Sequence, residues 1–243
     1  MCMLFTILYA LWFTVTLMLT VVMYLPYLIL KLLKKPRTAA RYVALVVPAW
    51  ARWVVRMTGS RVTVTGLENL PRDRAVCFIG NHQGNFDIPL VLGALRRKIG
   101  FIAKIELMKV PILPLWMKAL DCIFIDRKKL HHSLRNIQKG IQAVHAGNNM
   151  LLFPEGTRSR SARMGPFKPG GVQMAIKAGV PIVPLTVNGS FRVFEEKKRI
   201  RRGDLTLFVH PVIDPKLLDA AQKEALVQKI HDQISEKLPG RSG

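Results

Sequence analysis

Cysteine is scarce in this 243-residue chain, and acidic residues are heavily outnumbered. The three cysteines, Cys2, Cys77 and Cys122, form neither a set of pairs nor a C-x-x-C pattern, which argues against a disulfide scaffold and against a zinc module. Only 15 Asp and Glu face 37 Lys and Arg, so the net charge is +22 and acidic partners such as anionic lipids or phosphorylated small molecules are favoured. Half of the residues are apolar, which excludes a disordered chain.

Aromatic residues are also few, at 8% of the chain, and they concentrate in the N-terminal apolar region and in apolar runs of strand length. A surface that binds single-stranded nucleic acid interleaves cations with aromatic side chains on which the bases stack. A membrane-tethered basic protein that binds nucleic acid is therefore an alternative with little support, and we expect no nucleic acid among the partners.

The first 30 residues carry no charged side chain, and residues 4–30 are almost continuously apolar. A helix needs roughly 20 apolar residues to cross the hydrocarbon of a bilayer. The run lacks the basic start and the A-x-A cleavage site of a secretory signal, so we expect it to stay attached. Pro26 would kink or end a continuous helix, which leaves both a spanning helix and a helix that enters one leaflet open.

Basic side chains follow this run, and no acidic residue occurs from Lys31 to Ser60. By the positive-inside bias, this flank lies in the cytoplasm. Residues 39–57 place apolar side chains at helical spacing and leave arginines to reach lipid headgroups, which predicts a basic amphipathic helix at the membrane interface. A second buried or spanning helix is the alternative. We therefore expect residues 1–58 to anchor the protein in the cell membrane through two helices, and residues 59–243 to form a domain that faces the cytoplasm.

After Gly59, short apolar runs of strand length alternate with helical segments. This alternation predicts a single α/β domain with a mixed, largely parallel sheet of about seven strands flanked by helices. Helical spacing marks residues 130–144 and 215–238, and in the second segment Leu226, Ile230 and Ile234 are expected to face inward. The expected strands are 61–65, 75–79, 100–103, 122–125, 149–153, 181–187 and 205–210.

A histidine and an aspartate follow the second expected strand, where ligands of α/β sheets bind. A turn across residues 83–86 can fold His82 and Asp87 together, because Gly84 relaxes the backbone there. The carboxylate would then accept from one imidazole nitrogen and leave the other free to take a proton. Taken alone, the pattern is more often a loop histidine satisfied by the backbone, with the aspartate as a helix N-cap.

Candidate phosphate-binding residues follow three other strands. The run from Glu155 to Arg158 contains a glycine that lets the main chain approach an anion and an arginine that can grip phosphate through two N–H groups. Lys104 closes the strand at 100–103, and Arg127 follows the strand at 122–125. Together the three cations would form a cup for a phosphomonoester, whereas separately each would be an ordinary surface charge.

Four blocks in this order resemble the motifs of the glycerolipid acyltransferases, and within that family those of the 1-acyl-sn-glycerol-3-phosphate (lysophosphatidic acid) acyltransferases. The chain departs from the family pattern at Gly84, where a serine is common, and at Pro114 and Asp121, where glycines are usual. The blocks are Asn-His-Gln-Gly-Asn-Phe-Asp at 81–87, residues 104–127, Phe-Pro-Glu-Gly-Thr-Arg-Ser at 153–159, and Val-Pro-Ile-Val-Pro-Leu at 180–185.

The resemblance implies transfer of a fatty acyl group from a thioester donor to the sn-2 hydroxyl of lysophosphatidic acid, which makes phosphatidic acid in phospholipid biosynthesis. It implies His82 as general base and Asp87 as the partner that orients it, with no acyl-enzyme. Glycerol 3-phosphate or an ornithine lipid is the alternative acceptor. The residues implied to bind substrate are Lys104, Arg127, Glu155, Gly156, Thr157 and Arg158.

The implied partners are the two substrates and the membrane. Acyl-CoA or acyl carrier protein would deliver the acyl group, and the basic segments would hold the domain against anionic lipids at about 1 kcal/mol per Lys or Arg near the surface. The resemblance implies no metal and no cofactor other than the donor itself.

Overall fold

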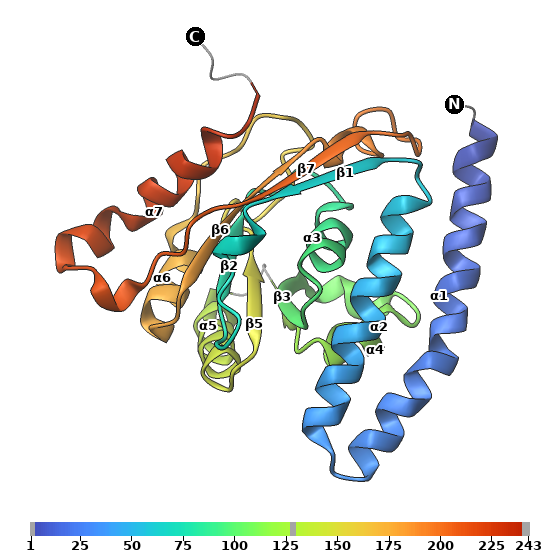
Figure 1. The fold of residues 1–243 in the computed structure, drawn as a ribbon, viewed down its shortest axis with the longest axis horizontal. Helices are drawn as coiled ribbons and strands as arrows, with labels where there is room; N and C mark the ends of the chain where they lie inside the picture. Colours follow the sequence, from blue (N-terminus) through green and yellow to red (C-terminus); the bar gives the residue numbers. More distant parts are fainter. Residues whose placement is uncertain (1–2, 127–129, 240–243) are drawn as a thin grey trace.

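The structure, a computed structural model, describes residues 3–126 and 130–239. One seven-stranded sheet carries helices on both faces, and two long N-terminal helices pack beside it (Figure 1). The strands are β1 (Arg61–Thr65), β2 (Cys77–Gly80), β3 (Ile99–Lys104), β4 (Ile123–Ile125), β5 (Asn149–Leu152), β6 (Ile182–Asn188) and β7 (Asp204–Val209). The helices are α1 (Met3–Leu32), α2 (Pro36–Arg56), α3 (Asp87–Leu95), α4 (Leu113–Ala119), α5 (Leu130–His145), α6 (Pro169–Ala178) and α7 (Ala220–Ser235).

The strand order is β1-β7-β6-β2-β5-β3-β4, and every pair of neighbours is parallel except β6 with β7. The predicted mixed, largely parallel sheet of seven strands is confirmed. Strand β2 is buried along its whole length because it lies between β5 and β6 and is covered on both faces. The carboxyl ends of β2, β5 and β6 therefore meet at one edge of the sheet, and the first and third blocks begin there.

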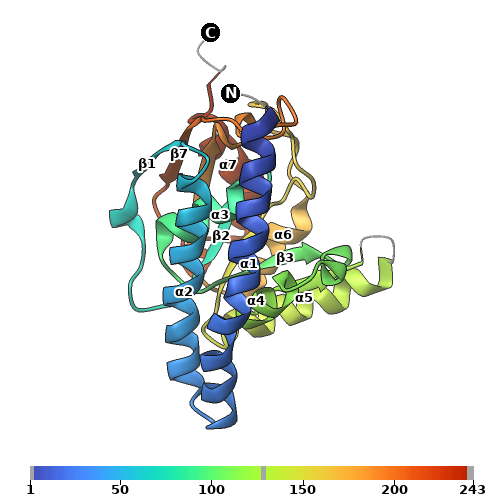
Figure 2. The same cartoon turned by 90° about the vertical axis from the view of Figure 1, so that its right-hand side faces the viewer.

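Alternate residues of the central strands build two cores. Phe78 and Leu151 belong to the core between the sheet and helices α2 to α4, whereas Ile79 and Leu152 belong to the core beneath α6 and α7. Figure 2 shows α1, α2 and α3 on one side of the sheet, the side opposite α6 and α7. Leu226, Ile230 and Ile234 of α7 are fully buried, as their spacing predicts.

Helix α1 is the one helix in the described part of the chain that is long and apolar enough to cross a membrane, judged by length and composition. It continues through Pro26. The ribbon of α1 bends in its C-terminal half (Figure 1). One side of α1 leans on α2, where the Tyr9 hydroxyl donates to Val54 O at 2.9 Å and the Tyr42 hydroxyl donates to Met23 O at 2.6 Å. Its other side exposes an uncharged stripe made of Leu4, Ile7, Leu8, Leu11, Val15, Met18, Leu19, Val22, Leu25 and Ile29.

Helix α2 is packed between α1 and the sheet domain. Val43, Val47 and Val54 are buried in the core that α2 shares with α3, while the predicted outward residues Arg41, Arg52 and Arg56 are exposed. This packing corresponds to the alternative of a buried second helix, because protein covers much of the apolar stripe that the interfacial prediction assigns to lipid. The boundary expected between residues 58 and 59 falls just after this helix, and extensive contacts between α2 and α3 cross it.

A buried histidine fastens α7 to the sheet. His210 follows β7 and is 3% exposed, and its Nε2 lies 2.8 Å from Thr186 Oγ1. The Thr186 hydroxyl donates its only hydrogen to Ile234 O of α7, so His210 Nε2 carries a proton and donates to Thr186. Burial, with a smaller contribution from Lys237, lowers the pKa of His210 to about 4.

We expect the free energy of unfolding to fall as the pH drops from about 6.5 towards 4. Over that range His210 becomes protonated in the unfolded chain and stays neutral in the folded protein. The free energy of unfolding therefore falls by about 3 kcal/mol by the time the pH reaches 4. Above pH 6.5 the residue is neutral in both states and contributes no pH dependence. Denaturant unfolding at several pH values should show the loss in the wild type and a flatter profile in His210→Gln; identical profiles would contradict the assignment.

Candidate active site

Two loops that leave neighbouring strands meet at the carboxyl edge of the sheet. Residues 81–87 follow β2, and residues 153–159 follow β5, its parallel neighbour. Two main-chain hydrogen bonds join the loops, from Ser159 N to His82 O at 2.8 Å and from Arg160 N to Gln83 O at 3.1 Å. The structure thus brings together the first and third blocks, as the order of the strands requires.

His82 and Asp87 form a hydrogen-bonded pair. His82 Nδ1 lies 2.6 Å from Asp87 Oδ2, and the aspartate is fully buried at the start of α3. The same oxygen accepts from Gln83 N at 2.6 Å and from Gly84 N at 2.9 Å, so the turn closes around the carboxylate. Because these bonds make Asp87 an acceptor, Nδ1 carries the ring hydrogen and Nε2 is the nitrogen that can take a proton.

The second carboxylate oxygen of Asp87 is also occupied. The Ser190 hydroxyl, fully buried just after β6, donates to Asp87 Oδ1. Asn81 fixes the other end of the loop, since its amide bonds Val187 N and Val187 O of β6, both at 2.8 Å. The aspartate is therefore oriented from two directions, and the loop is tied to a strand that lies in the middle of the sheet.

The imidazole ring is held on its face as well as at its edge. It stacks on Phe153 with 4.1 Å between ring centroids and 11° between planes. The side chain of His82 remains 18% exposed, which leaves the ring accessible from the site. Stacking, the buried aspartate and the loop bonds together fix the position of Nε2.

Glu155, which the resemblance assigns to substrate binding, accepts hydrogen bonds from the backbone of the site. Its Oε1 accepts from His82 N at 2.6 Å, and its Oε2 accepts from Gly165 N at 2.9 Å. Burial raises the pKa of this carboxyl, and the hydrogen bonds from His82 N and Gly165 N oppose that rise. In this geometry Glu155 positions His82 and the following loop.

Arg158 reaches the His82 loop. Its Nη1 donates to Asn85 Oδ1 and lies 3.3 Å from Glu195 Oε1, while about a third of its side chain, 32%, stays exposed. A guanidinium held on one edge can offer its remaining N–H groups to a phosphate. The proposed base and the proposed anion-binding side chain thus lie on loops that contact each other.

The described contacts do not link the other predicted substrate-binding residues to His82. Lys104 ends β3 with its ammonium 2.8 Å from Glu106 and is more than half exposed, and the described contacts do not join it to Arg158. Gly156 turns the chain with φ of +71° against Lys168, and Thr157 is exposed beside it. Arg127 lies outside the described residues.

Three residues whose side-chain hydrogen bonds hold the His82 loop are not among the site residues predicted from the sequence. Asn81 opens the first block, so its place beside a histidine at a strand end is a signal that could find it. Ser190 lies two residues beyond β6, where the strand-end argument also applies. Glu195 lies in a turn-rich loop that carries several charges, and nothing in its local pattern separates it from the exposed Glu196 beside it.

Cys77 is an unsuitable nucleophile. It lies inside β2, fully buried, and burial raises the pKa of its thiol to about 12. Within the described ranges, no three His, Cys, Asp or Glu side chains gather as a metal site would require.

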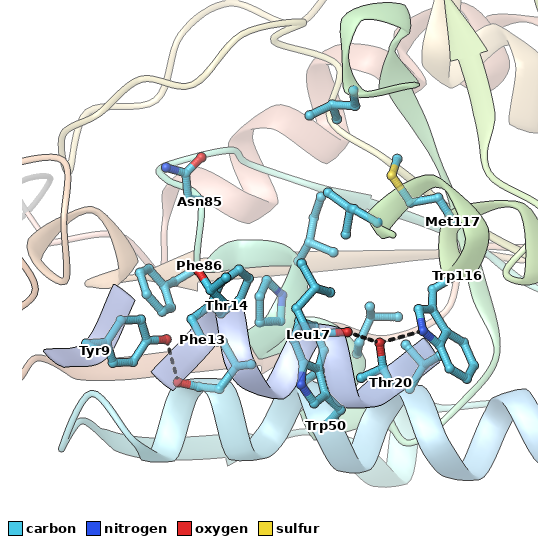
Figure 3. Close-up of a pocket in the computed structure, with 18 of the residues that line it drawn as sticks. Tyr9, Phe13, Thr14, Leu17, Thr20, Trp50, Asn85, Phe86, Trp116 and Met117 are labelled. Carbon is cyan, nitrogen blue, oxygen red and sulfur yellow. Dashed lines mark hydrogen bonds between the residues drawn. The ribbon is translucent and has the colours of Figure 1, made fainter. Parts of the chain in front are cut away.

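An apolar cavity of about 540 Å³ opens beside the His82 loop, residues 81–87. Its walls come from α1, α2, α3 and α4, and it runs from Asn85 and Phe86 at one end to Trp116 and Met117 at the other (Figure 3). The indole N–H of Trp116 donates to Thr20 Oγ1 at 3.0 Å, and Thr20 donates to Leu17 O at 2.6 Å. The indole nitrogen of Trp50, which also lines the cavity, is buried without a hydrogen-bond partner among the described residues. Such a cavity suits a long apolar ligand.

The comparisons with known proteins identify the class of enzyme to which this site belongs. Residues 61–188 match the model of the Acyltransferase family, and the chain belongs to that family. A 1-acyl-sn-glycerol-3-phosphate acyltransferase of Borreliella burgdorferi is 31% identical over 183 residues, which cover 75% of this chain and 73% of that protein. A probable 1-acyl-sn-glycerol-3-phosphate acyltransferase of Mycoplasma pneumoniae is 38% identical over 152 residues, which cover 60% of this chain but 56% of that protein.

A solved structure is similar over nearly the whole chain. The crystal structure of the 1-acyl-sn-glycerophosphate (LPA) acyltransferase from Thermotoga maritima aligns with a TM-score of 0.81 and 27% identity, covering 95% of this chain and 93% of that one. The similarity therefore includes the two N-terminal helices as well as the α/β domain.

Proposed function

We propose that this protein transfers a fatty acyl group from a thioester donor to the sn-2 hydroxyl of lysophosphatidic acid, forming phosphatidic acid for phospholipid biosynthesis. The observation that carries the proposal is the contact between two loops that place the His82–Asp87 pair beside Arg158. The names of the similar proteins support the same acceptor.

In the proposed reaction, His82 Nε2 removes the proton from the sn-2 hydroxyl as its oxygen attacks the thioester carbonyl. The tetrahedral intermediate then collapses, the carbon–sulfur bond breaks, and the leaving thiolate takes the proton from the imidazolium. Asp87 holds the ring in the useful tautomer and stabilises its positive charge. The arrangement is the base half of a serine hydrolase triad, in which the acceptor's own hydroxyl replaces the serine.

Arg158 binds the phosphate of the acceptor through the part of its guanidinium that stays exposed. Lys104 adds positive charge from the end of β3, and Gly156 and Thr157 shape the turn beside the phosphate. Arg127 is a further phosphate-binding cation by the resemblance alone. Anchoring the phosphate holds the sn-2 oxygen near Nε2, and such positioning supplies much of the rate enhancement.

The apolar cavity holds a fatty chain. The cavity begins at Asn85 and Phe86 of the His82 loop. A fatty chain whose carbonyl or glycerol end lies at His82 can therefore enter the cavity directly. Residues from Thr6 to Thr20 of α1 line it over about 21 Å of helix. Its length along α1 therefore limits the chain that it can accept.

Helix α1 inserts into one leaflet of the cell membrane, with the α/β domain on the cytoplasmic side. Because α1 lies along α2, and α2 is buried against α3, a spanning α1 would carry the exposed Arg41 and Arg52 into the hydrocarbon, which is costly. The uncharged stripe of α1 faces lipid instead, and anionic lipids attract the basic segments at Lys31–Arg37 and Lys197–Arg202. The acceptor then reaches the site from the leaflet.

The test is a panel of donors and acceptors with purified full-length protein in mixed micelles. Two donors, acyl-CoA and acylated acyl carrier protein, each with a labelled acyl group, are offered separately with lysophosphatidic acid, glycerol 3-phosphate and an ornithine lipid. The proposal requires that, with at least one donor, lysophosphatidic acid is the acceptor with the highest kcat/KM and phosphatidic acid is the product. A preference for another acceptor would replace lysophosphatidic acid, and no transfer to any acceptor would refute the activity.

We expect Arg158→Ala to raise the KM for lysophosphatidic acid about tenfold or more, since hydrogen bonds between charged groups contribute about 1.5–3 kcal/mol each. The KM for the donor should change much less, because the donor does not depend on the phosphate grip. Arg163→Ala is the matched control: it removes an exposed arginine from the same loop. An unchanged acceptor KM in Arg158→Ala would assign the phosphate to other residues.

A further inference from the structure

Glu195 is a buried carboxylate that none of the four blocks contains. It follows the short helical turn at Ser190–Arg192, and its side chain is 2% exposed. Its Oε1 accepts from Asn85 N at 2.8 Å and lies 3.3 Å from Arg158 Nη1, whereas its Oε2 has no hydrogen-bond partner. The proposed mechanism gives this side chain no part, although it touches both loops of the site.

The unpartnered oxygen points at Gly84. A Cβ at position 84 would lie 2.5 Å from Glu195 Oε2 and 2.9 Å from its Cδ. Real side chains do not approach so closely, so the carboxylate would have to move. It cannot move freely, because the main chain of Asn85 and the guanidinium of Arg158 hold Oε1. The absence of a side chain at Gly84 therefore makes room for Glu195.

The charge of Glu195 matters because of this burial. A buried carboxylate is costly unless a cation compensates it, and Arg158 is the cation within reach. The pairing restrains Arg158 on the side of the site where Asn85 also accepts from it. One carboxylate thus braces the arginine and the His82 loop at the same time.

We propose that Glu195 is a positioning residue for the acceptor's phosphate, and that Gly84 and Glu195 function as a matched pair in which the missing side chain at 84 admits the carboxylate that braces Arg158. The inference rests on the proposed role of Arg158 in phosphate binding. It makes position 84 a determinant of acceptor affinity only while a carboxylate-shaped side chain occupies position 195.

The test is a double-mutant cycle with full-length protein, lysophosphatidic acid and the donor that the wild type prefers. We expect Gly84→Ala to raise the acceptor KM about tenfold, and Glu195→Ala to raise it by several-fold because Arg158 loses its brace. In the Glu195→Ala background, Gly84→Ala should add less than about twofold, since the space is then empty. In the Glu195→Gln background, the side chain keeps its shape, so Gly84→Ala should still raise the KM strongly.

Controls separate this inference from other failures. Glu196→Ala removes the neighbouring exposed carboxylate and should leave the acceptor KM near that of the wild type. If Gly84→Ala fails to fold, the double variant must fold and melt near Glu195→Ala. Equal effects of Gly84→Ala with and without Glu195, or no effect in the wild type, would overturn the pairing. A wild type that does not acylate lysophosphatidic acid would instead refute the proposed function.

Discussion

His82→Ala is expected to lower the rate of acyl transfer by a factor of about 10²–10⁴ at saturating substrates, the usual contribution of a general base. Only Nε2 of this ring is free to take the acceptor's proton, because Nδ1 is bonded to the buried Asp87. The KM for lysophosphatidic acid should change little, since Arg158 and the cavity are untouched. A single-turnover assay with labelled donor measures the chemical step directly.

The fold should survive this substitution. The backbone bonds of the loop, to Glu155, Ser159 and Arg160, do not use the imidazole. His145→Ala, which removes an exposed histidine at the end of α5, is the control for a loss of imidazole elsewhere. Retention of about a tenth or more of the wild-type activity by a folded His82→Ala protein is a smaller loss than removal of a general base causes, and it would remove the general-base assignment.

Removal of residues 1–58 is expected to unfold the protein rather than release a free domain. Val43, Val47, Ala51, Val54 and Val55 of α2 are each at most 7% exposed and pack into the core with α3. Burying a valine contributes roughly 1.5–3 kcal/mol, so the loss of this helix is of the same order as the 5–15 kcal/mol that stabilises a domain. Far-UV circular dichroism and limited proteolysis of the truncated chain in detergent measure the outcome.

Removal of residues 1–34 is the matched comparison, because it deletes α1 and leaves α2 in place. Few α1 side chains are buried, Tyr9, Thr16 and Thr20 among them. This shorter truncation should fold in detergent and lose its affinity for vesicles, while the cavity loses one wall. A folded, cooperatively melting protein after removal of residues 1–58 would show instead that α2 is dispensable for the domain.

The strands could be predicted from the sequence because each is a short run, either mainly apolar or, as in β1 and β7, alternating polar and apolar residues. All seven occur. The bounds of β1 are as predicted, and those of the other six differ by one or two residues: β2 starts at Cys77 rather than at 75, and β7 ends at Val209 rather than at 210. Residue 210 is buried in spite of being a histidine, since its ring bonds Thr186. The periodicity of apolar residues indicates which side chains are buried. It does not fix where a strand ends, because that depends on hydrogen bonds to the neighbouring strand.

The surroundings of α2 could not be predicted in the same way. An apolar stripe with arginines opposite is satisfied equally by lipid and by another helix, and the structure shows α3 and α1 covering much of it. Some residues of the site could be predicted from the sequence, and others could not. His82, Asp87 and Arg158 stand in recognisable blocks, whereas Ser190 and Glu195 act through the folding of β6 and its following loop against the first block. Those contacts depend on tertiary structure, which no local pattern encodes.

The two main-chain bonds that join the loops after β2 and β5 have a consequence for how this scaffold can diversify. They tie peptide groups rather than side chains, so the two loops stay joined when side chains that project from either loop are replaced. Exposed side chains such as Thr157 and Arg160 can therefore change without separating the loops that carry His82 and Arg158.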